Sequence, residues 1–303
     1  MMADAARSMC LLLNAPAAGD ALLRTAVDGL RKAGHRIEVR ALWEPGQAEQ
    51  FAAEAVARDV FDAIVAGGGD GTLNEVVNGV MTARPDGPPA VGVLPYGTAN
   101  DFAIGVGMPV GDPVAALQLI AAAEPRRIDL GQVNDRWFIN AASVGLNAEV
   151  TADTPGPLKQ LFGGTAYSLN ALSKLADDTH RPATVTAADL NWQGDLLMLI
   201  VANARTAGGG YVIAPHAELD DGLLDLTLVA NVPAGELVKA LAHALTTGEP
   251  DHPAVIQQQV TSLDLEAEAA VTFNLDGESL SNCRCRFQVR PRALPVLMGP
   301  RPS

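Results

Sequence analysis

The 303-residue chain has few cysteines, few aromatic residues and no long apolar run, and these shortages exclude several classes of protein. Its three cysteines, Cys10, Cys283 and Cys285, are too few for a disulfide framework and lack the spacing of a zinc site. Strand alternation would place Cys283 and Cys285 on one face, so buried or half-buried thiols are expected rather than metal ligands. No run approaches the roughly 18 apolar residues of a transmembrane helix, and the opening residues, with Asp4, lack the apolar core of a signal peptide. The sequence therefore predicts a cytoplasmic protein with no transmembrane segment.

Basic residues are also scarce: 21 Lys and Arg against 35 Asp and Glu give a formal net charge of −14. General nucleic-acid binding needs a basic face, so the charge balance argues against it. It argues equally against simple electrostatic attachment to an anionic membrane, unless a local patch departs from the average. A hydrophobic content of 48% is nevertheless enough for well-formed cores, and the length suits two domains.

The first 127 residues alternate between strand-like and helix-like segments. Strands are expected at 8–14, 35–42, 60–66 and 90–94, and helices at 20–33, 47–58 and 72–81. Strands that alternate with helices at this spacing indicate βαβ units, and hence a parallel sheet covered on both faces. Ligands bind beyond the carboxyl ends of the strands in such sheets, so a site is expected at that edge.

After about residue 127 the pattern changes to strands joined mostly by short turns. Strands are expected at 128–133, 136–144, 184–190, 196–201, 223–229, 255–265, 270–275 and 284–289, with helical interruptions at 158–176 and 234–245. The predicted fold class is therefore α/β plus β, with a parallel-sheet nucleotide-binding domain over 1–127 and a mainly antiparallel β domain over 128–290. Residues 291–303 are expected to form a C-terminal tail that could pack back on the N-terminal domain.

The segment Ala66–Asn78, A-G-G-G-D-G-T-L-N-E-V-V-N, is typical of a strand, a glycine turn and a helix. Its glycines let bare backbone N–H groups approach an anion, and the helix aims its free N–H groups at the same point. A second turn, P-Y-G-T-A-N-D at Pro95–Asp101, follows the next strand at the same edge of the sheet. These turns predict a phosphate site. It is not a P-loop, because no lysine follows the glycines, nor a dinucleotide fingerprint, because Thr72 or Asn74 stands where the third glycine is needed.

The string G-G-D-G-T-L-N-E-V-V-N-G at Gly68–Gly79 resembles the nucleotide motif of the diacylglycerol-kinase and sphingosine-kinase superfamily, in particular of its bacterial soluble lipid kinases. The resemblance continues in the family's order through N-A-P (Asn14–Pro16), P-Y-G-T-A-N-D-F-A (Pro95–Ala103), N-A-A-S-V-G-L-N-A (Asn140–Ala148), G-G-G-Y-V-I-A-P-H-A (Gly208–Ala217), L-D-D-G-L-L-D (Leu219–Asp225) and L-D-G-E (Leu275–Glu278). NAD kinases and phosphofructokinases carry strings similar to G-G-D-G-T, whereas the longer motifs together with D-G-E are specific. The resemblance implies an ATP- and Mg²⁺-dependent kinase that transfers the γ-phosphate to a lipid hydroxyl, such as that of diacylglycerol.

The nucleotide site implied by this resemblance comprises Gly68, Gly69, Asp70, Gly71, Thr72, Leu73, Asn74 and Thr98. The glycines are expected to offer backbone N–H groups to the ATP phosphates. Asp70 either shapes the turn or reaches Mg²⁺ through water, and it is grouped with the catalytic residues. Thr72 is expected to cap the following helix and to donate to a phosphate oxygen, and Asn74 to bond ribose or phosphate. Thr98 could contact the nucleotide, while Asn100–Asp101 either joins this site or starts a helix.

Asp220, Asp221 and Asp225 crowd one expected hairpin. Hard oxygen ligands suit Mg²⁺, and a solvated acidic turn is the alternative. By the resemblance, the family's structural metal falls on the side chain of Asp221 and the backbone carbonyls of Glu218 and Leu223.

The tetrapeptide L-D-G-E contains a favourable hairpin turn, Asp276–Gly277. By the resemblance, the family's proposed general base falls on Glu278, which would accept the hydroxyl proton during phosphoryl transfer. One position departs from the family pattern. Where many relatives have a threonine after the second strand, this chain has Leu42, so one contact on the adenine side differs.

The lipid side of the predicted reaction is less well defined by the sequence. The segment Pro155–Leu175 places a leucine-rich stripe on a helix with Lys159 and Lys174, which is either part of a lipid entrance or ordinary core packing. Arg284 and Arg286 share a strand face and could meet phosphates or be solvated. The expected partner is a lipid substrate met transiently at the inner membrane face, with no nucleic acid, and a homodimer is left open. Two alternatives remain: an NAD-kinase-like phosphotransferase acting on a soluble alcohol, and a nucleotide- or lipid-binding regulator without turnover.

Overall fold

The computed structural model describes residues 6–144, 181–233, 236 and 254–300. The chain divides into two compact units. Unit 1 comprises residues 1–130 together with 291–303, and unit 2 comprises residues 131–290.

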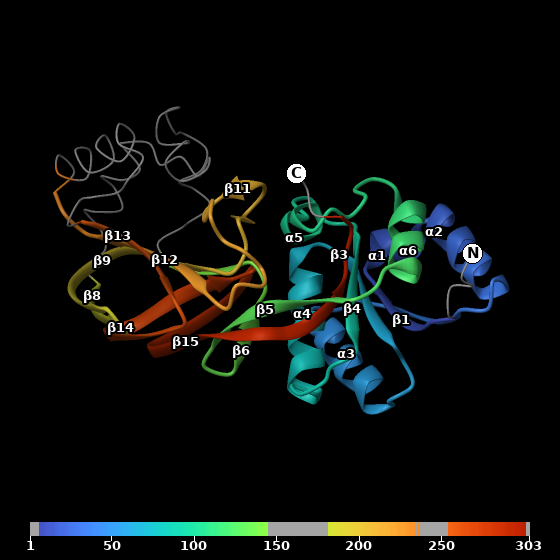
Figure 1. Cartoon of the computed structure of the whole chain (residues 1–303), viewed down its shortest axis with the longest axis horizontal. Helices are drawn as coiled ribbons and strands as arrows, with labels where there is room; N and C mark the ends of the chain where they lie inside the picture. The colour runs from blue at the N-terminus through green and yellow to red at the C-terminus, as the bar shows by residue number, and fades with distance from the viewer. Residues whose placement is uncertain (1–5, 145–180, 234–235, 237–253, 301–303) are drawn as a thin grey trace. The chain divides into compact units, whose positions relative to one another are not determined.

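Unit 1 contains a parallel sheet with helices on both sides of it (Figure 1). Its elements are β1 (Ser8–Leu13), α1 (Ala15–Gly19), α2 (Ala21–Lys32), β2 (Arg36–Ala41), α3 (Gln47–Ala57), β3 (Ala63–Gly68), α4 (Asp70–Ala83), β4 (Ala90–Pro95), α5 (Asp101–Gly105), α6 (Pro113–Ala122) and the start of β5 (Arg126–Val133). The strands pair in parallel in the order β4-β3-β1-β2. Helices α2 and α6 pack together, as do α3 and α4. The end of β15 (Glu278–Leu297) adds a further parallel strand, with Val296 opposite Val91 of β4.

Local sequence signals account for the elements of unit 1. In β1 every residue after Ser8 is buried, as expected for a strand covered on both faces. The carboxylate of Asp20 caps α2 by accepting hydrogen bonds from the N–H groups of Leu22 (2.7 Å) and Leu23 (3.2 Å). The predicted helix at 20–33 therefore differs from α2 by one residue at each end. The strand predicted at 60–66 is displaced: β3 ends at Gly68, because the glycines still pair with β4.

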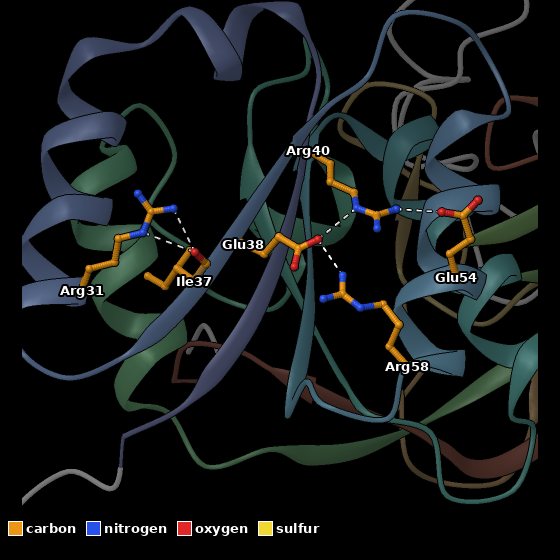
Figure 2. A network of polar contacts seen from close by, with 6 residues as sticks. All are labelled: Arg31, Ile37, Glu38, Arg40, Glu54 and Arg58. Carbon is orange, nitrogen blue, oxygen red and sulfur yellow. Dashed lines mark hydrogen bonds and ion pairs between the residues drawn. The ribbon is translucent and has the colours of Figure 1, made fainter.

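Charged side chains join the edge strand β2 to helix α3 (Figure 2). Glu38 contacts Arg40 on the same strand at 3.2 Å and Arg58, just after α3, at 2.7 Å. Arg40 also bonds Glu54 of α3 at 2.8 Å. The hydrogen bond from Arg58, more than that from Arg40, holds the pKa of the Glu38 carboxyl below its ordinary value. This network fastens β2 and α3 on either side of the loop that connects them.

Unit 2 is built from antiparallel strands. They are β6 (Arg136–Phe138), β7 (Ala141–Val144), β8 (Pro182–Ala187), β9 (Leu190–Ala202), β10 (Thr206–Ala207), β11 (Tyr211–Val212), β12 (Leu224–Ala230), β13 (Val255–Val260), β14 (Ser262–Leu275) and most of β15. Unit 2 has a core of buried side chains, in which the rings of Phe273 and Phe287 meet edge to face at 5.4 Å. A second apolar cluster, including Met198, Ile200 and Ile213, lies apart from the first. Because side chains alternate between the two faces of β9, this strand contributes residues to both clusters.

The expectation for the paired cysteines is wrong for one of them. Cys285 is buried, but Cys283 is exposed. The register of β14 against β15 shifts between Glu266 and Val271, and Cys283 lies opposite this irregularity. Because a bulge interrupts the regular alternation of faces, spacing alone could not place this thiol.

The two arginines that were expected either to meet phosphates or to be solvated, Arg284 and Arg286, are exposed and form cross-strand ion pairs. Arg284 lies 3.7 Å from Glu266, and Arg286 lies 3.8 Å from Asp264. All four side chains are exposed, so these pairs contribute little to stability. The helix expected at 158–176, the apolar stripe of Pro155–Leu175 and, apart from residue 236, the helix expected at 234–245 lie outside the described residues. None of the helices in the described part of the chain has the length and hydropathy of a membrane span.

Candidate functional site

The glycine turn lies where β3 passes into α4. Gly68 still belongs to the strand, and Gly69 is the N-cap residue of α4, without a side chain to cap the helix. The helix begins at Asp70, two residues earlier than predicted. Thr72 is therefore not the capping residue: it lies in the first turn, and its side chain occupies the space that a Cβ on Gly68 would need. The N-terminus of α4 thus presents backbone N–H groups with no capping side chain at the N-cap.

Asp70 connects the glycine turn to the second predicted turn. Its two carboxylate oxygens accept hydrogen bonds from the backbone N–H groups of Asp101 and Phe102, both at 3.1 Å. These N–H groups begin α5, so Asp70 acts as a tertiary cap for that short helix. Of the two roles weighed for Asp70, shaping of the turn is the one that these hydrogen bonds support.

The two turns approach each other so closely that Gly97 has no room for a side chain and Gly69 has little. A Cβ built on Gly97 would overlap the Cα atom of Gly69. Asn100 closes the second turn with φ +55°, and its side chain bonds both the N–H (2.8 Å) and the carbonyl (2.7 Å) of Gly97. The segment at 100–101 therefore forms the turn and starts α5, which was one of the two alternatives. Thr98, between these residues, is exposed.

Tyr96 and Asp20 form a further contact at this edge that the sequence did not indicate. The Tyr96 hydroxyl donates to Asp20 at 2.7 Å, and the Tyr96 N–H donates to the carbonyl of Gly68 at 2.9 Å. The hydrogen bond from Tyr96 is the main reason that the pKa of Asp20 lies below its ordinary value. Burial, followed by the bond to Asp20, raises the pKa of Tyr96. The ends of β3 and β4 and the start of α2 are thereby held together.

Two of the predicted nucleotide residues face the interior of unit 1. Leu73 and Asn74 are both buried. The Asn78 amide, one turn further along α4, donates to the backbone carbonyl and to the side-chain oxygen of Asn74, each at 3.0 Å. These contacts support the packing of α4. A direct contact of Leu73 or Asn74 with nucleotide stays a prediction.

In unit 2, the D-G-E segment forms the tip of the β14–β15 hairpin. Asp276 (φ +49°) and Gly277 (φ +104°) both have positive φ, the conformation of a type I′ turn. The Asp276 carboxylate accepts three backbone hydrogen bonds, from Ile139 (2.6 Å), Asn140 (3.0 Å) and Ala141 (2.9 Å). Glu278, the first residue of β15, is exposed. A carboxylate held by three N–H groups fixes the tip of the hairpin next to Glu278.

The acidic hairpin before β12 holds one carboxylate in a tight turn. Asp221 accepts a hydrogen bond from the N–H of Leu223 at 2.9 Å. The pKa of Asp225 is raised, first by burial and further by the negative charge of Asp221, against a lowering by Gln259 and His216. Within the described residues, no group of three or more His, Cys, Asp or Glu side chains forms a metal cluster. A metal at this turn would therefore depend on one carboxylate and on backbone carbonyls.

Comparison with known proteins identifies the family. Residues 8–133 match the model of the diacylglycerol kinase catalytic domain, and residues 140–298 match that of the YegS C-terminal NAD kinase beta sandwich-like domain. The second model spans more than half of the chain, so the chain belongs to the YegS family, whose N-terminal part here is a diacylglycerol kinase catalytic domain, and the expectation that it is a kinase is confirmed.

Similar proteins cover nearly the whole chain. A protein of Pseudomonas aeruginosa (strain UCBPP-PA14) named "Probable lipid kinase YegS-like" is 40% identical over 286 residues, which is 94% of this chain and 92% of the relative. A protein of the same name from Yersinia enterocolitica is 38% identical over 291 residues, 96% of each chain. The crystal structure of a diacylglycerol kinase from Bacillus anthracis str. Sterne covers 97% of each chain with a TM-score of 0.70 at 21% identity, a likeness of fold.

Proposed function

We propose that the protein is an ATP- and Mg²⁺-dependent lipid kinase that transfers the γ-phosphate to a hydroxyl group of diacylglycerol or a similar lipid. The proposal rests on one observation. Asp70 and the contact of Gly69 with Gly97 join two turns at the edge of a parallel sheet where the strands have their carboxyl ends. Ligands bind at this edge in open α/β sheets. The names of the curated relatives support a lipid as the acceptor.

The N-terminus of α4 fits the phosphates of ATP. The first-turn N–H groups of a helix form an anion site, and no side chain of the N-cap residue occupies it here. Gly69 adds no Cβ, so a phosphate can approach the backbone closely. Thr98 on the adjoining turn is exposed and offers a hydroxyl donor. The negative charge of Asp70 beside this site is offset, because both of its oxygens already accept backbone N–H groups.

Mg²⁺ can be held in two ways that the residues allow. The oxygens of Asp70 keep lone pairs for a water ligand of a nucleotide-bound ion. In unit 2 the side chain of Asp221, with the carbonyls of Glu218 and Leu223, would supply hard oxygen ligands. Burial, and then the negative charge of Asp221, raise the pKa of Asp225, and a nearby cation would lower it again. Bound Mg²⁺ would supply charge neutralisation for the transferred phosphoryl group.

Glu278 is the proposed general base. Its carboxylate is exposed at the start of β15, and the turn before it is fixed through Asp276. In phosphoryl transfer the protein mainly positions groups, and a carboxylate accepts the proton of the attacking hydroxyl. An exposed carboxylate on a fixed turn meets this requirement.

The test is transfer of radiolabelled phosphate from ATP to a panel of lipids, with NAD included as a soluble acceptor. Glu278→Gln should lower kcat by about 100-fold or more with little change in the KM for ATP, because general acid–base groups contribute about 10²–10⁴-fold. Glu266→Gln is the matched control, since Glu266 is also an exposed carboxylate on this hairpin. Unchanged turnover in the Glu278 variant would exclude Glu278 as the general base. Formation of NADP without any labelled lipid would show that the acceptor is a soluble alcohol and not a lipid.

A lipid acceptor also requires transient contact with a membrane. The proposal therefore includes peripheral binding at the inner membrane face, without a transmembrane segment. Sedimentation of the protein with lipid vesicles containing diacylglycerol measures this contact directly, and loss of sedimentation when diacylglycerol is omitted would assign it to the substrate.

A further inference from the structure

Trp43 is unusually exposed for its type. Its side chain is 86% exposed, the highest value among the large apolar side chains on the surface of the described residues. Scattered apolar side chains on a surface are ordinary. A tryptophan, however, carries a large aromatic face that contributes most when it is covered.

The backbone that carries Trp43 is fixed by two side chains. Gln47 Oε1 accepts hydrogen bonds from the N–H groups of Trp43 (2.8 Å) and Glu44 (3.3 Å). The Glu75 carboxylate accepts from the N–H groups of Gly46 (3.0 Å) and, one residue into α3, of Ala48 (3.1 Å). Gly46, the N-cap of α3, has φ +83° and no side chain of its own, so Glu75 performs the capping. An exposed indole on a fixed backbone is preorganised for a ligand.

Glu75 also connects this loop to the proposed phosphate site. It lies on α4, the helix whose first turn presents the N–H groups at Asp70–Thr72. Strand β2, which leads into the loop, and β3, which leads into the glycine turn, lie on either side of β1. Neighbouring strands are about 4.8 Å apart, so the two loops leave the same edge of the sheet about 10 Å apart. This separation suits the two ends of a nucleoside triphosphate, with phosphates at α4 and the base near β2.

The residues of the loop indicate how a base would be held. Leu42 continues the pairing of β2 by donating its N–H to the carbonyl of Leu13 at 2.8 Å, and its side chain offers no hydrogen bond to a base. The indole of Trp43 can stack on any base, because every base has a π-face. The network of Glu38, Arg40 and Glu54 keeps β2 and α3 in place on both sides of the loop (Figure 2).

From these observations we infer that Trp43 stacks on the base of the bound nucleotide and supplies most of the recognition of that base. The inference rests on the proposed ATP-dependent function. Stacking discriminates weakly between bases, so Trp43 should favour ATP and GTP to a similar extent.

The experiment measures binding of ATP, GTP and inorganic tripolyphosphate by isothermal titration calorimetry to the wild-type protein, Trp43→Ala and Trp43→Phe. Stacking of a base on an aromatic side chain predicts that Trp43→Ala weakens ATP and GTP binding about 5- to 100-fold. Binding of tripolyphosphate, which has no base, should not change, and Trp43→Phe should retain most of the affinity. Val39→Ala is the control, because Val39 is a 40% exposed apolar side chain on β2.

The outcomes separate this inference from the proposed function. Wild-type affinity for ATP in Trp43→Ala would overturn the role of Trp43 while leaving the kinase proposal intact. Unchanged ATP affinity together with lost binding to diacylglycerol-containing vesicles would also overturn it, and would assign Trp43 to a lipid surface. If the wild-type protein itself binds neither ATP nor GTP, the proposed function fails and the inference fails with it. An equal loss of tripolyphosphate affinity in Trp43→Ala would show damage to the loop rather than a missing stacking contact, and would count against the inference.

Discussion

Replacing Asp70 by alanine should destabilise unit 1 even when no nucleotide or metal is present. Its carboxylate accepts backbone N–H groups from Asp101 and Phe102, which lie 31 and 32 residues further along the chain. These two bonds hold the second turn against the glycine turn. If the principal role of Asp70 were to reach Mg²⁺, its removal would matter only in the presence of the ion.

The size of the effect follows from the bonds that are lost. A hydrogen bond to a charged group contributes about 1.5–3 kcal/mol, and the lower value applies at a half-buried turn. Two such bonds give about 3 kcal/mol. Loss of a negative charge from the first turn of α4 adds about 0.3–1 kcal/mol. Asp70→Asn keeps one acceptor oxygen, so it should lose about half as much.

Urea denaturation in the presence of EDTA measures this difference, with circular dichroism as the probe. Asp86→Ala is a suitable control, because Asp86 is an exposed carboxylate in the same unit. The expected order of stability is wild type and Asp86→Ala, then Asp70→Asn, then Asp70→Ala. An Asp70→Ala variant as stable as the wild type in EDTA would show that Asp70 does not hold the two turns together, and would favour a role in metal binding.

Three further predictions test other parts of the structure. Gly97→Ala should separate the two turns, lower the free energy of unfolding and abolish ATP binding, whereas Gly71→Ala, where a Cβ meets nothing within 4 Å, should not lower the free energy of unfolding; equal stability of the two variants would contradict the close approach. Because burial, and then the charge of Asp221, raise the pKa of Asp225 above its ordinary 3.8, the folded state binds the proton more tightly than the unfolded state. The contribution of Asp225 to the free energy of unfolding should therefore fall as the pH rises from 3.8 through that raised pKa, and Asp225→Asn should remove this contribution, as urea titrations of the two proteins at a series of pH values would measure. Millimolar Mg²⁺ should lessen the fall in the wild type but not in Asp221→Asn, and an equal effect of Mg²⁺ on both would argue against the metal site. Finally, a thiol reagent at pH 8 should label one site rapidly, the exposed Cys283, and substitution of that residue by serine should remove the fast phase; a fast phase that persists would contradict the exposure.

Local patterns identified most elements of unit 1. The apolar run of β1, the cap at Asp20 and the glycine turn each act through neighbouring residues, so short-range sterics and hydrogen bonding define them. The same holds for the D-G turn at Asp276–Gly277, whose positive φ values favour these residue types. Two predictions failed. Cys283 is exposed rather than buried, because the pairing of β14 with β15 is irregular beside it, and Thr72 does not cap α4, because the helix already begins at Asp70.

The sequence by itself determined that a glycine turn follows a buried strand, that a second turn follows the next, and that a D-G hairpin precedes Glu278. Only the tertiary structure decided what the acidic residues in these turns bind. Asp70 reaches α5, Glu75 caps α3, and Asp276 holds residues 139–141, more than 130 positions away along the chain. The physical reason is that a carboxylate serves equally well as a metal ligand, a base or an acceptor for N–H groups. Which of these it becomes depends on the groups that strand register and helix packing bring within about 3 Å of it.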